Sequence, residues 1–279
     1  MNRRRPKTSR KPQRTTQDQA RPKGSFRDAR SEGYLAASRR PLYALILILP
    51  LAAAFELGSL LYLGVGAADG TPVQTVSAYR LLGRLFETFG AAGYYLPALV
   101  VLATLLVWHM IRQDPWHLRP GYLVAMAIEA TAWALPLLGL AAIIGAAHAA
   151  AITPTPSPTS TGLPPDLADW PLGARLTIAI GAGLYEEFLF RLVLIEVVVV
   201  LARDLFRLSA TRARIIAVIA SAILFTVYHQ PSGPDVATAI ITYGALGVVL
   251  AYLYAYRGFG IAVGAHAVYD IAVLALLNP

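Results

Sequence analysis

From Pro41 onward, hydrophobic residues form runs of about 20 positions separated by short polar or proline-rich connections. A helix of this length matches the thickness of a bilayer core. The pattern therefore predicts an all-α, polytopic membrane protein with about seven transmembrane helices. Their expected bounds are 42–64, 91–111, 121–148, 173–202, 214–230, 236–256 and 259–277.

Composition supports this fold class. Hydrophobic residues make up 56% of the 279 positions and charged residues 14%, whereas soluble domains carry about 25% charge. The mean hydropathy is +0.55. The chain has no cysteine, so disulfides, thiolate nucleophiles and cysteine-ligated metals are excluded.

Residues 1–40 differ from the rest of the chain. They hold 13 of the 24 Lys and Arg residues but only three acidic residues, although the net charge of the whole chain is +8. This segment is rich in Pro, Gln, Ser and Thr and lacks apolar periodicity, so we expect a disordered basic tail. A nucleic-acid-binding arm is one interpretation. A cytoplasmic segment that touches anionic lipid is simpler, and no nucleic-acid partner is expected.

The distribution of arginine predicts the orientation in the cell membrane. Arginines concentrate in three connections, at 112–120, 203–214 and 256–258, whereas 151–171 and 231–235 have no Lys or Arg. By the positive-inside rule, the N-terminus is cytoplasmic and the C-terminus lies outside.

Three parts of the chain follow from these patterns. The basic tail occupies 1–40, and the first three helices with a proline-rich loop occupy 41–172. A C-terminal core occupies 173–279.

The span at 173–202 contains three charged residues, Glu186, Glu187 and Arg191, in the sequence GLYEEFLFRLVL. An ionised group at the centre of a bilayer-spanning helix costs roughly 2.5–3.5 kcal/mol on insertion scales. Glu187 and Arg191 lie four residues apart and so share one helix face. Glu186 is rotated away from that face and needs another partner.

Two later spans contain histidines at the same spacing. Phe225 and His229 lie four residues apart, as do His266 and Asp270, so each pair shares a helix face. Structural contacts between helices are one interpretation of these groups. A functional site is favoured, because intramembrane charges usually face an interior cavity and His with Asp or Glu serves acid–base chemistry or metal binding.

These groups resemble the motifs of the CPBP family of intramembrane proteases, which includes type II CAAX prenyl endopeptidases, bacteriocin-processing proteins and Abi-type immunity proteins. The family carries EExxxR, FxxxH and HxxxN or HxxxD on successive membrane helices. This chain has EEFLFR at 186–191, FTVYH at 225–229 and HAVYD at 266–270. The resemblance covers roughly residues 173–279.

The resemblance implies an endopeptidase that cleaves a peptide or protein substrate in or at the lipid bilayer. Glu186 would activate water together with His229, and His266 with Asp270 would hold or polarise the scissile carbonyl. A carboxylate in an apolar pocket is a stronger base than in water, because burial disfavours its charge. Stabilisation of the oxyanion is the second chemical requirement.

By the same resemblance, Glu187 and Arg191 would form a pair that supports the site. Asp270 stands where many family members have Asn. A carboxylate repels an oxyanion, so Asp270 would be protonated, orient His266 or bind a metal. Zinc or another divalent ion is the alternative cofactor, although a metal-independent mechanism is favoured. The candidate metal ligands are Glu186, His229, His266 and Asp270.

Other functional classes have different sequence signatures. The chain has no HExxH motif, no second Asp in a GxGD setting and no GxSG-like serine. A proton-coupled transporter would use the same Glu and His residues as a relay, but such folds usually show internal repeats, and none is visible. A protease-like scaffold without activity is the third alternative.

Two further expectations concern glutamates inside the predicted spans. Glu56 and Glu129 lie well inside predicted spans, where interhelical hydrogen bonds are favoured over catalysis. Glu186 is expected to reach His229 only if the span at 214–230 extends past Gln230, or if the span at 173–202 is broken near Gly181–Gly183.

Overall fold

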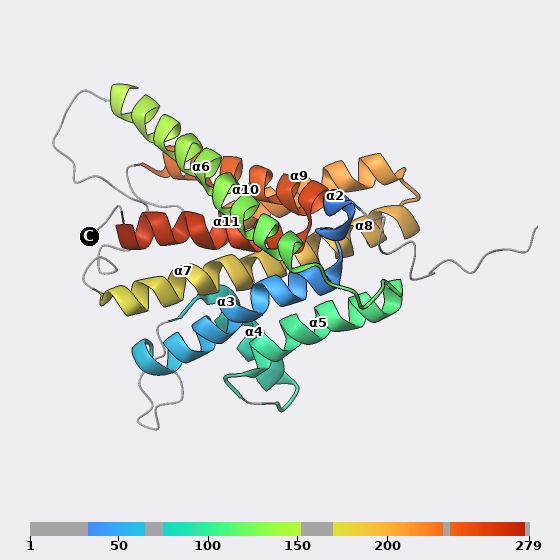
Figure 1. Ribbon diagram of the computed structural model, residues 1–279. Coiled ribbons are helices and arrows are strands. Elements are labelled where there is room, and N and C mark those ends of the chain that lie inside the picture. The colour runs from blue at the N-terminus through green and yellow to red at the C-terminus, as the bar shows by residue number, and fades with distance from the viewer. Residues whose placement is uncertain (1–32, 65–74, 92, 152–169, 231–234, 277–279) are drawn as a thin grey trace, which may run out of the picture. The chain divides into compact units, whose positions relative to one another are not determined.

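The computed structural model describes residues 33–64, 75–91, 93–151, 170–230 and 235–276. All regular secondary structure in these residues is helical, as predicted (Figure 1). The α-helices are α2 Tyr34–Ala37, α3 Pro41–Tyr62, α4 Ser77–Thr88, α5 Leu96–Arg112, α6 Pro120–Ala151, α7 Leu172–Glu187, α8 Leu194–Asp204, α9 Ala210–Tyr228, α10 Val236–Arg257 and α11 Phe259–Ile271. Two π-helical segments, η2 Phe188–Val193 and η3 Ala272–Leu276, follow α7 and α11.

The helices agree with the predicted polytopic membrane fold. Among the described residues, α3, α6, α9 and α10 are long and apolar enough to cross a membrane, and α5 and α11 are shorter apolar helices. The remaining predicted span corresponds to the consecutive helical segments α7, η2 and α8. The second span begins later than expected, at Leu96, because glycines at 90 and 93 accompany a turn before the helix.

Helix α4 was not predicted. It lies between the first two predicted spans and buries Ala78, Tyr79 and Leu82, whereas Arg80 and Arg84 are exposed. Buried positions at a spacing of three to four residues are typical of a short amphipathic helix. A helix of 12 residues with two arginines has no long apolar run by which it could be predicted.

The packed part of the chain begins before residue 41, which corrects part of the predicted disordered tail. Residues 1–32 lie outside the described residues, but α2 is folded and buries Ala37. The Tyr34 hydroxyl donates to Glu129 Oε2 at 2.5 Å, and Arg257 donates to both oxygens of Glu129 at 2.5 and 2.7 Å. Burial and the nearby Glu129 carboxylate raise the pKa of Tyr34 to about 12. Glu129 therefore makes the interhelical hydrogen bonds that the sequence predicted.

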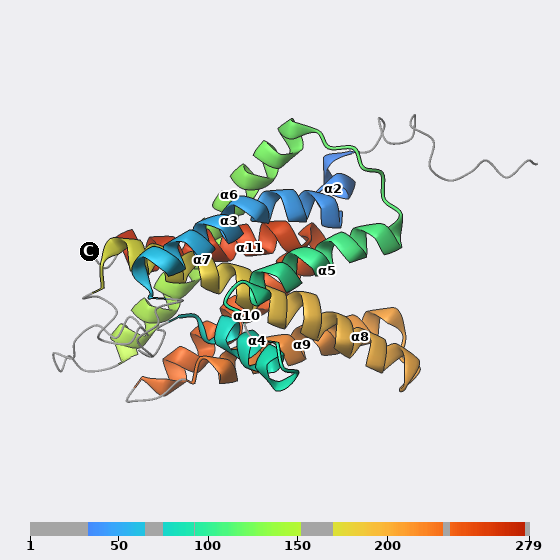
Figure 2. The same ribbon diagram turned by 90° about the horizontal axis from the view of Figure 1, so that it is seen from below.

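Helices from both predicted membrane parts, 41–172 and 173–279, share one core. Helix α3 packs against α7 and α11, and α6 packs against α11 and α10 (Figures 1 and 2). Glu56 on α3 accepts a hydrogen bond from the Tyr185 hydroxyl of α7 at 3.1 Å, as predicted for an interhelical contact. The predicted proline-rich connection lies outside the described residues from 152 to 169.

A glycine allows α7 and α11 to approach each other closely. A Cβ atom on Gly183 would lie 2.6 Å from the backbone nitrogen of Ala267. Real side chains do not tolerate this distance, so only glycine fits here without a shift of the helices. The close approach brings the carboxylates of α7 within reach of His266 on α11.

Glu186 and His229 lie at similar distances along their helices from the α8–α9 connection, and neither of the two conditions expected from the sequence is needed to bring them together. Helix α8 is followed by α9, and the two helices pack against each other. Glu186 lies 18 residues before the end of α8, and Tyr228 lies 18 residues after the start of α9. Both are therefore about 27 Å from the connection at 1.5 Å per residue. The expected break near Gly181–Gly183 is absent from α7, and α9 ends before Gln230.

Candidate active site

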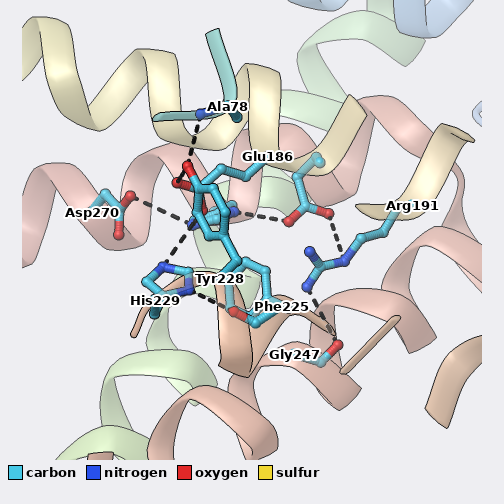
Figure 3. Close-up of polar contacts among 10 residues, drawn as sticks. Ala78, Glu186, Arg191, Phe225, Tyr228, His229, Gly247 and Asp270 are labelled. Atoms are coloured by element: carbon cyan, nitrogen blue, oxygen red, sulfur yellow. Dashed lines mark hydrogen bonds and ion pairs between the residues drawn. The ribbon is translucent and has the colours of Figure 1, made fainter. Parts of the chain in front are cut away.

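Three predicted site residues meet around one carboxylate oxygen of α7 (Figure 3). Glu186 Oε2 lies 3.6 Å from His229 Nε2 and 4.0 Å from His266 Nε2. His266 Nε2 also lies 3.5 Å from Asp270 Oδ2, one helical turn along α11. Residues far apart in the sequence are thus adjacent in space, as the sequence analysis requires.

The charged side chains of this site are buried, and burying a charge costs free energy. Glu187 and Arg191 have no exposed surface, and Glu186 is 5% exposed. Buried charges are tolerated when they are paired and hydrogen-bonded. Their partners therefore show how the site is held together.

Glu187 lies between Arg191 and His266. Its Oε2 atom lies 3.3 Å from Arg191 Nε, and its Oε1 atom lies 2.8 Å from His266 Nδ1. Arg191 also donates to the carbonyl oxygen of Gly247 on α10 at 3.4 Å. Because Glu187 accepts from Nδ1 of His266, the Nε2 atom is directed at Glu186 and Asp270. The predicted pair is present, and it also fixes the orientation of His266.

Phe225 connects this pair to the second histidine. The Arg191 guanidinium lies 4.3 Å from the centre of the Phe225 ring, a cation–π contact that is strongest in a desolvated site. The carbonyl oxygen of Phe225 is 2.8 Å from His229 Nδ1. A carbonyl only accepts, so Nδ1 of His229 carries the hydrogen. In the neutral ring, Nε2 is then the basic nitrogen, and it faces Glu186.

Two tyrosines in this site were missed by the sequence analysis. The Tyr228 hydroxyl donates to Glu186 Oε1 at 3.2 Å and accepts from the backbone N–H of Ala78 at 2.8 Å (Figure 3). The Tyr243 ring stacks on His229 with centroids 4.2 Å apart and an interplanar angle of 21°. Tyr228 directly precedes His229 and could have been considered. Tyr243 lies on α10, outside every motif.

A small cavity of ≈ 40 Å³ adjoins the two histidines and Asp270. Three leucines and Tyr243 contribute to its walls. A water molecule needs a cavity of about 10–15 Å³ together with polar partners. The cavity therefore has the size and the polar lining to hold water next to His229, His266 and Asp270.

The four candidate metal ligands do not form a metal-binding group as they are placed. In the part of the chain that the structure describes, no three His, Asp or Glu side chains are arranged to hold one metal ion. Catalytic zinc usually takes three protein ligands at about 2.0–2.2 Å. We therefore derive no chemical step through a metal.

Comparison with known families agrees with the motifs. Residues 168–272 match the family model described as type II CAAX prenyl endopeptidase Rce1-like. The matched segment is less than half of the chain and contains all six predicted site residues. It confirms the resemblance to CPBP family intramembrane proteases. The segment 168–272 is thus similar to membrane-embedded peptidases that act on a peptide or protein substrate at the membrane. No curated protein and no solved structure matches the chain.

Proposed function

We propose that this chain is an intramembrane endopeptidase in which Glu186 and His229 activate water for attack on a peptide bond. The observation that carries the proposal is the position of Glu186 Oε2. This atom is buried, accepts no hydrogen bond from the described residues, and faces Nε2 of both His229 and His266. A general base needs this access to a water molecule, and the basic Nε2 of His229 beside it can help to accept the proton.

The proposed reaction uses Glu186 twice. Water in the cavity gives a proton to Glu186, with His229 as the adjacent base, and its oxygen attacks the scissile carbonyl carbon. The carbonyl oxygen then carries negative charge in a tetrahedral intermediate. When the C–N bond breaks, Glu186 returns the proton to the leaving amine. The products are a carboxylic acid and an amine.

His266 and Asp270 are proposed to serve the carbonyl side of the reaction. His266 has carboxylates on both ring nitrogens, with Glu187 at 2.8 Å from Nδ1 and Asp270 at 3.5 Å from Nε2. Nearby negative charges favour the protonated, donating imidazole. A donating Nε2 can stabilise the oxyanion. Asp270 then orients His266. This role would explain why this chain has Asp at position 270, where many CPBP family members have Asn.

The first test compares Glu186→Gln with the wild type on a peptide library in detergent. Loss of a general base lowers kcat by on the order of 100- to 10,000-fold. Glu56→Gln is the matched control, because Glu56 is also an intramembrane glutamate that accepts from a tyrosine. The control should keep its activity. Unchanged cleavage in Glu186→Gln would remove this residue from the mechanism.

Zinc or another divalent ion is the alternative means of activating water. Metal analysis of the purified wild type, His229→Ala and His266→Ala distinguishes the two mechanisms. The proposed mechanism predicts no stoichiometric metal in any of them. One equivalent of zinc in the wild type that is lost in both variants would replace it with a metal-dependent one.

A further inference from the structure

A second cavity, of ≈ 280 Å³, lies beside the candidate active site. It is formed between the amphipathic helix α4 and the end of α9. The residues that line it are Ser77, Arg80, Leu81, Arg84, Tyr228 and Gln230.

The charge of this cavity is positive. Arg80 and Arg84 lie four residues apart on α4, so they share the face that lines the cavity. Arg80 Nη2 donates to Ser77 Oγ at 3.0 Å, which uses one of its five N–H groups. Among the described lining residues there is no Asp or Glu. Like charges at this spacing destabilise a helix, and a shared anion would relieve that repulsion.

Helix α4, which carries these arginines, is anchored to the rest of the described fold. Its opposite face buries Ala78, Tyr79 and Leu82. The Tyr79 ring packs against Phe55 of α3 and Tyr185 of α7, with centroids 5.3 and 5.2 Å apart. The arginines therefore belong to an anchored helix.

Tyr228 connects the basic cavity to the catalytic carboxylate. It lines the cavity, and its hydroxyl donates to Glu186 Oε1 at 3.2 Å. The same hydroxyl accepts from the Ala78 N–H in the first turn of α4. A molecule in this cavity is thus separated from Glu186 by a single side chain.

We propose that this cavity binds a carboxylate of the peptide substrate and so directs the scissile bond toward Glu186. The inference rests on the proposed endopeptidase function. Arginine forks match a carboxylate in geometry and charge, and binding energy away from the bond orients the reacting group. The carboxylate is either the C-terminus of the peptide or an Asp or Glu side chain. A position next to Tyr228 favours the substrate over a lipid phosphate.

The test combines protein variants with matched peptides. The double variant Arg80→Gln/Arg84→Gln is compared with Arg212→Gln/Arg214→Gln, which removes the same charge from the opposite end of α9. An acidic peptide that the wild type cleaves is prepared with a C-terminal amide, and separately with its Asp and Glu residues changed to Asn and Gln. Removing the bound carboxylate should raise KM of the wild type about tenfold. Whichever peptide shows the increase identifies the source of the carboxylate.

The double variant should raise KM for the acidic peptide by a similar factor and lose discrimination between the peptides. The control variant should discriminate as the wild type does. Equal loss for acidic and neutral peptides in Arg80→Gln/Arg84→Gln would overturn the inference. A lipid effect would also overturn the inference. If nanodiscs of phosphatidylglycerol stabilise the protein more than nanodiscs of phosphatidylcholine, if this difference depends on the two arginines, and if no peptide selectivity is seen, the cavity binds lipid.

A binding measurement separates this inference from the proposed function. Anisotropy of a fluorescent acidic peptide is followed on Glu186→Gln protein, with and without the two arginine substitutions. If no peptide is cleaved by the wild type but binding still depends on arginine and carboxylate, the proposed function fails and the site stands. If binding does not depend on the arginines but the wild type cleaves normally, the inference about the cavity fails and the proposed function stands.

Discussion

At the scale of single residues, the Tyr228 hydroxyl holds the Glu186 carboxylate in place. Tyr228→Phe removes the donor to Glu186 and the acceptor for Ala78 but keeps the ring. A hydrogen bond to a charged group contributes about 1.5–3 kcal/mol. We therefore expect kcat to fall by roughly 10- to 100-fold with little change in KM. Steady-state kinetics on a cleaved peptide measures this split.

Tyr254→Phe is the matched control for this prediction. The Tyr254 hydroxyl donates to Glu196 at 2.7 Å, so the change breaks another tyrosine–glutamate contact between helices. It should lower the thermal midpoint but keep kcat. If Tyr228→Phe behaves like Tyr254→Phe, the hydroxyl of Tyr228 has a structural role only.

The sequence revealed the charged groups of the site but not all of their partners. Glu187 and Arg191 could be paired because helical spacing places them on one face. The contact between Glu187 and His266 was not predictable, since it depends on how closely α7 approaches α11. Tyr243 was missed for the same reason, because its stacking on His229 arises only when α10 packs onto α9.

At the scale of elements, the close approach of α7 and α11 is the most sensitive contact. Gly183→Ala places a Cβ atom 2.6 Å from the Ala267 nitrogen, so one helix must shift. Overpacking of this kind costs about 1–3 kcal/mol, and a 1 Å misplacement of reacting groups can lower the rate by about 100-fold. We expect a lower thermal midpoint together with a loss of kcat.

Gly139→Ala on α6 is the control for that substitution. A Cβ atom on Gly139 has nothing within 4 Å, and alanine in a helix interior is favoured over glycine. This variant should match or exceed the wild type in stability and keep full activity. Wild-type kinetics in Gly183→Ala would contradict the importance of the close approach.

The elements that the sequence predicted best are those with the strongest signal. Long apolar helices such as α3 and α10 follow directly from their hydrophobic runs. Helix α4 gave no such signal. The predicted bounds themselves place Glu186 16 residues before residue 202 and His229 15 residues after residue 214, so the two residues are level without any break in α7. The expectation that a break or a longer helix was needed was therefore wrong.

At the scale of the whole molecule, the contacts between helix ends agree with the predicted alternation of the spans, which assigns these ends to one side of the membrane. Ala78 in the first predicted outward connection meets Tyr228 at the outward end of α9. His148 at the end of α6 lies 2.7 Å from Asp235 at the start of α10, where a second outward end is predicted. Ends assigned to the same side of the membrane are therefore found together.

The predicted orientation can be measured directly because the chain has no cysteine. A membrane-impermeant maleimide applied to intact cells should label Ser157→Cys and leave Ser25→Cys unlabelled. Permeabilised cells should label both, which controls for reactivity. Labelling of Ser25→Cys from outside would reverse the topology and place the arginines of α4 on the cytoplasmic side.

The small cavity beside the histidines has a kinetic consequence. Its volume of ≈ 40 Å³ admits water but is far too small for an amino-acid residue, and Leu137 of α6 with Leu246 and Leu250 of α10 contribute to its walls. A peptide residue therefore enters the space beside His229, His266 and Asp270 only after the walls of this cavity move apart. Such gating motions often limit turnover. If the proposed peptidase function holds, acyl-chain order in the surrounding membrane then becomes a control on turnover, since stiffer lipid opposes this movement while leaving the bond-breaking steps unchanged.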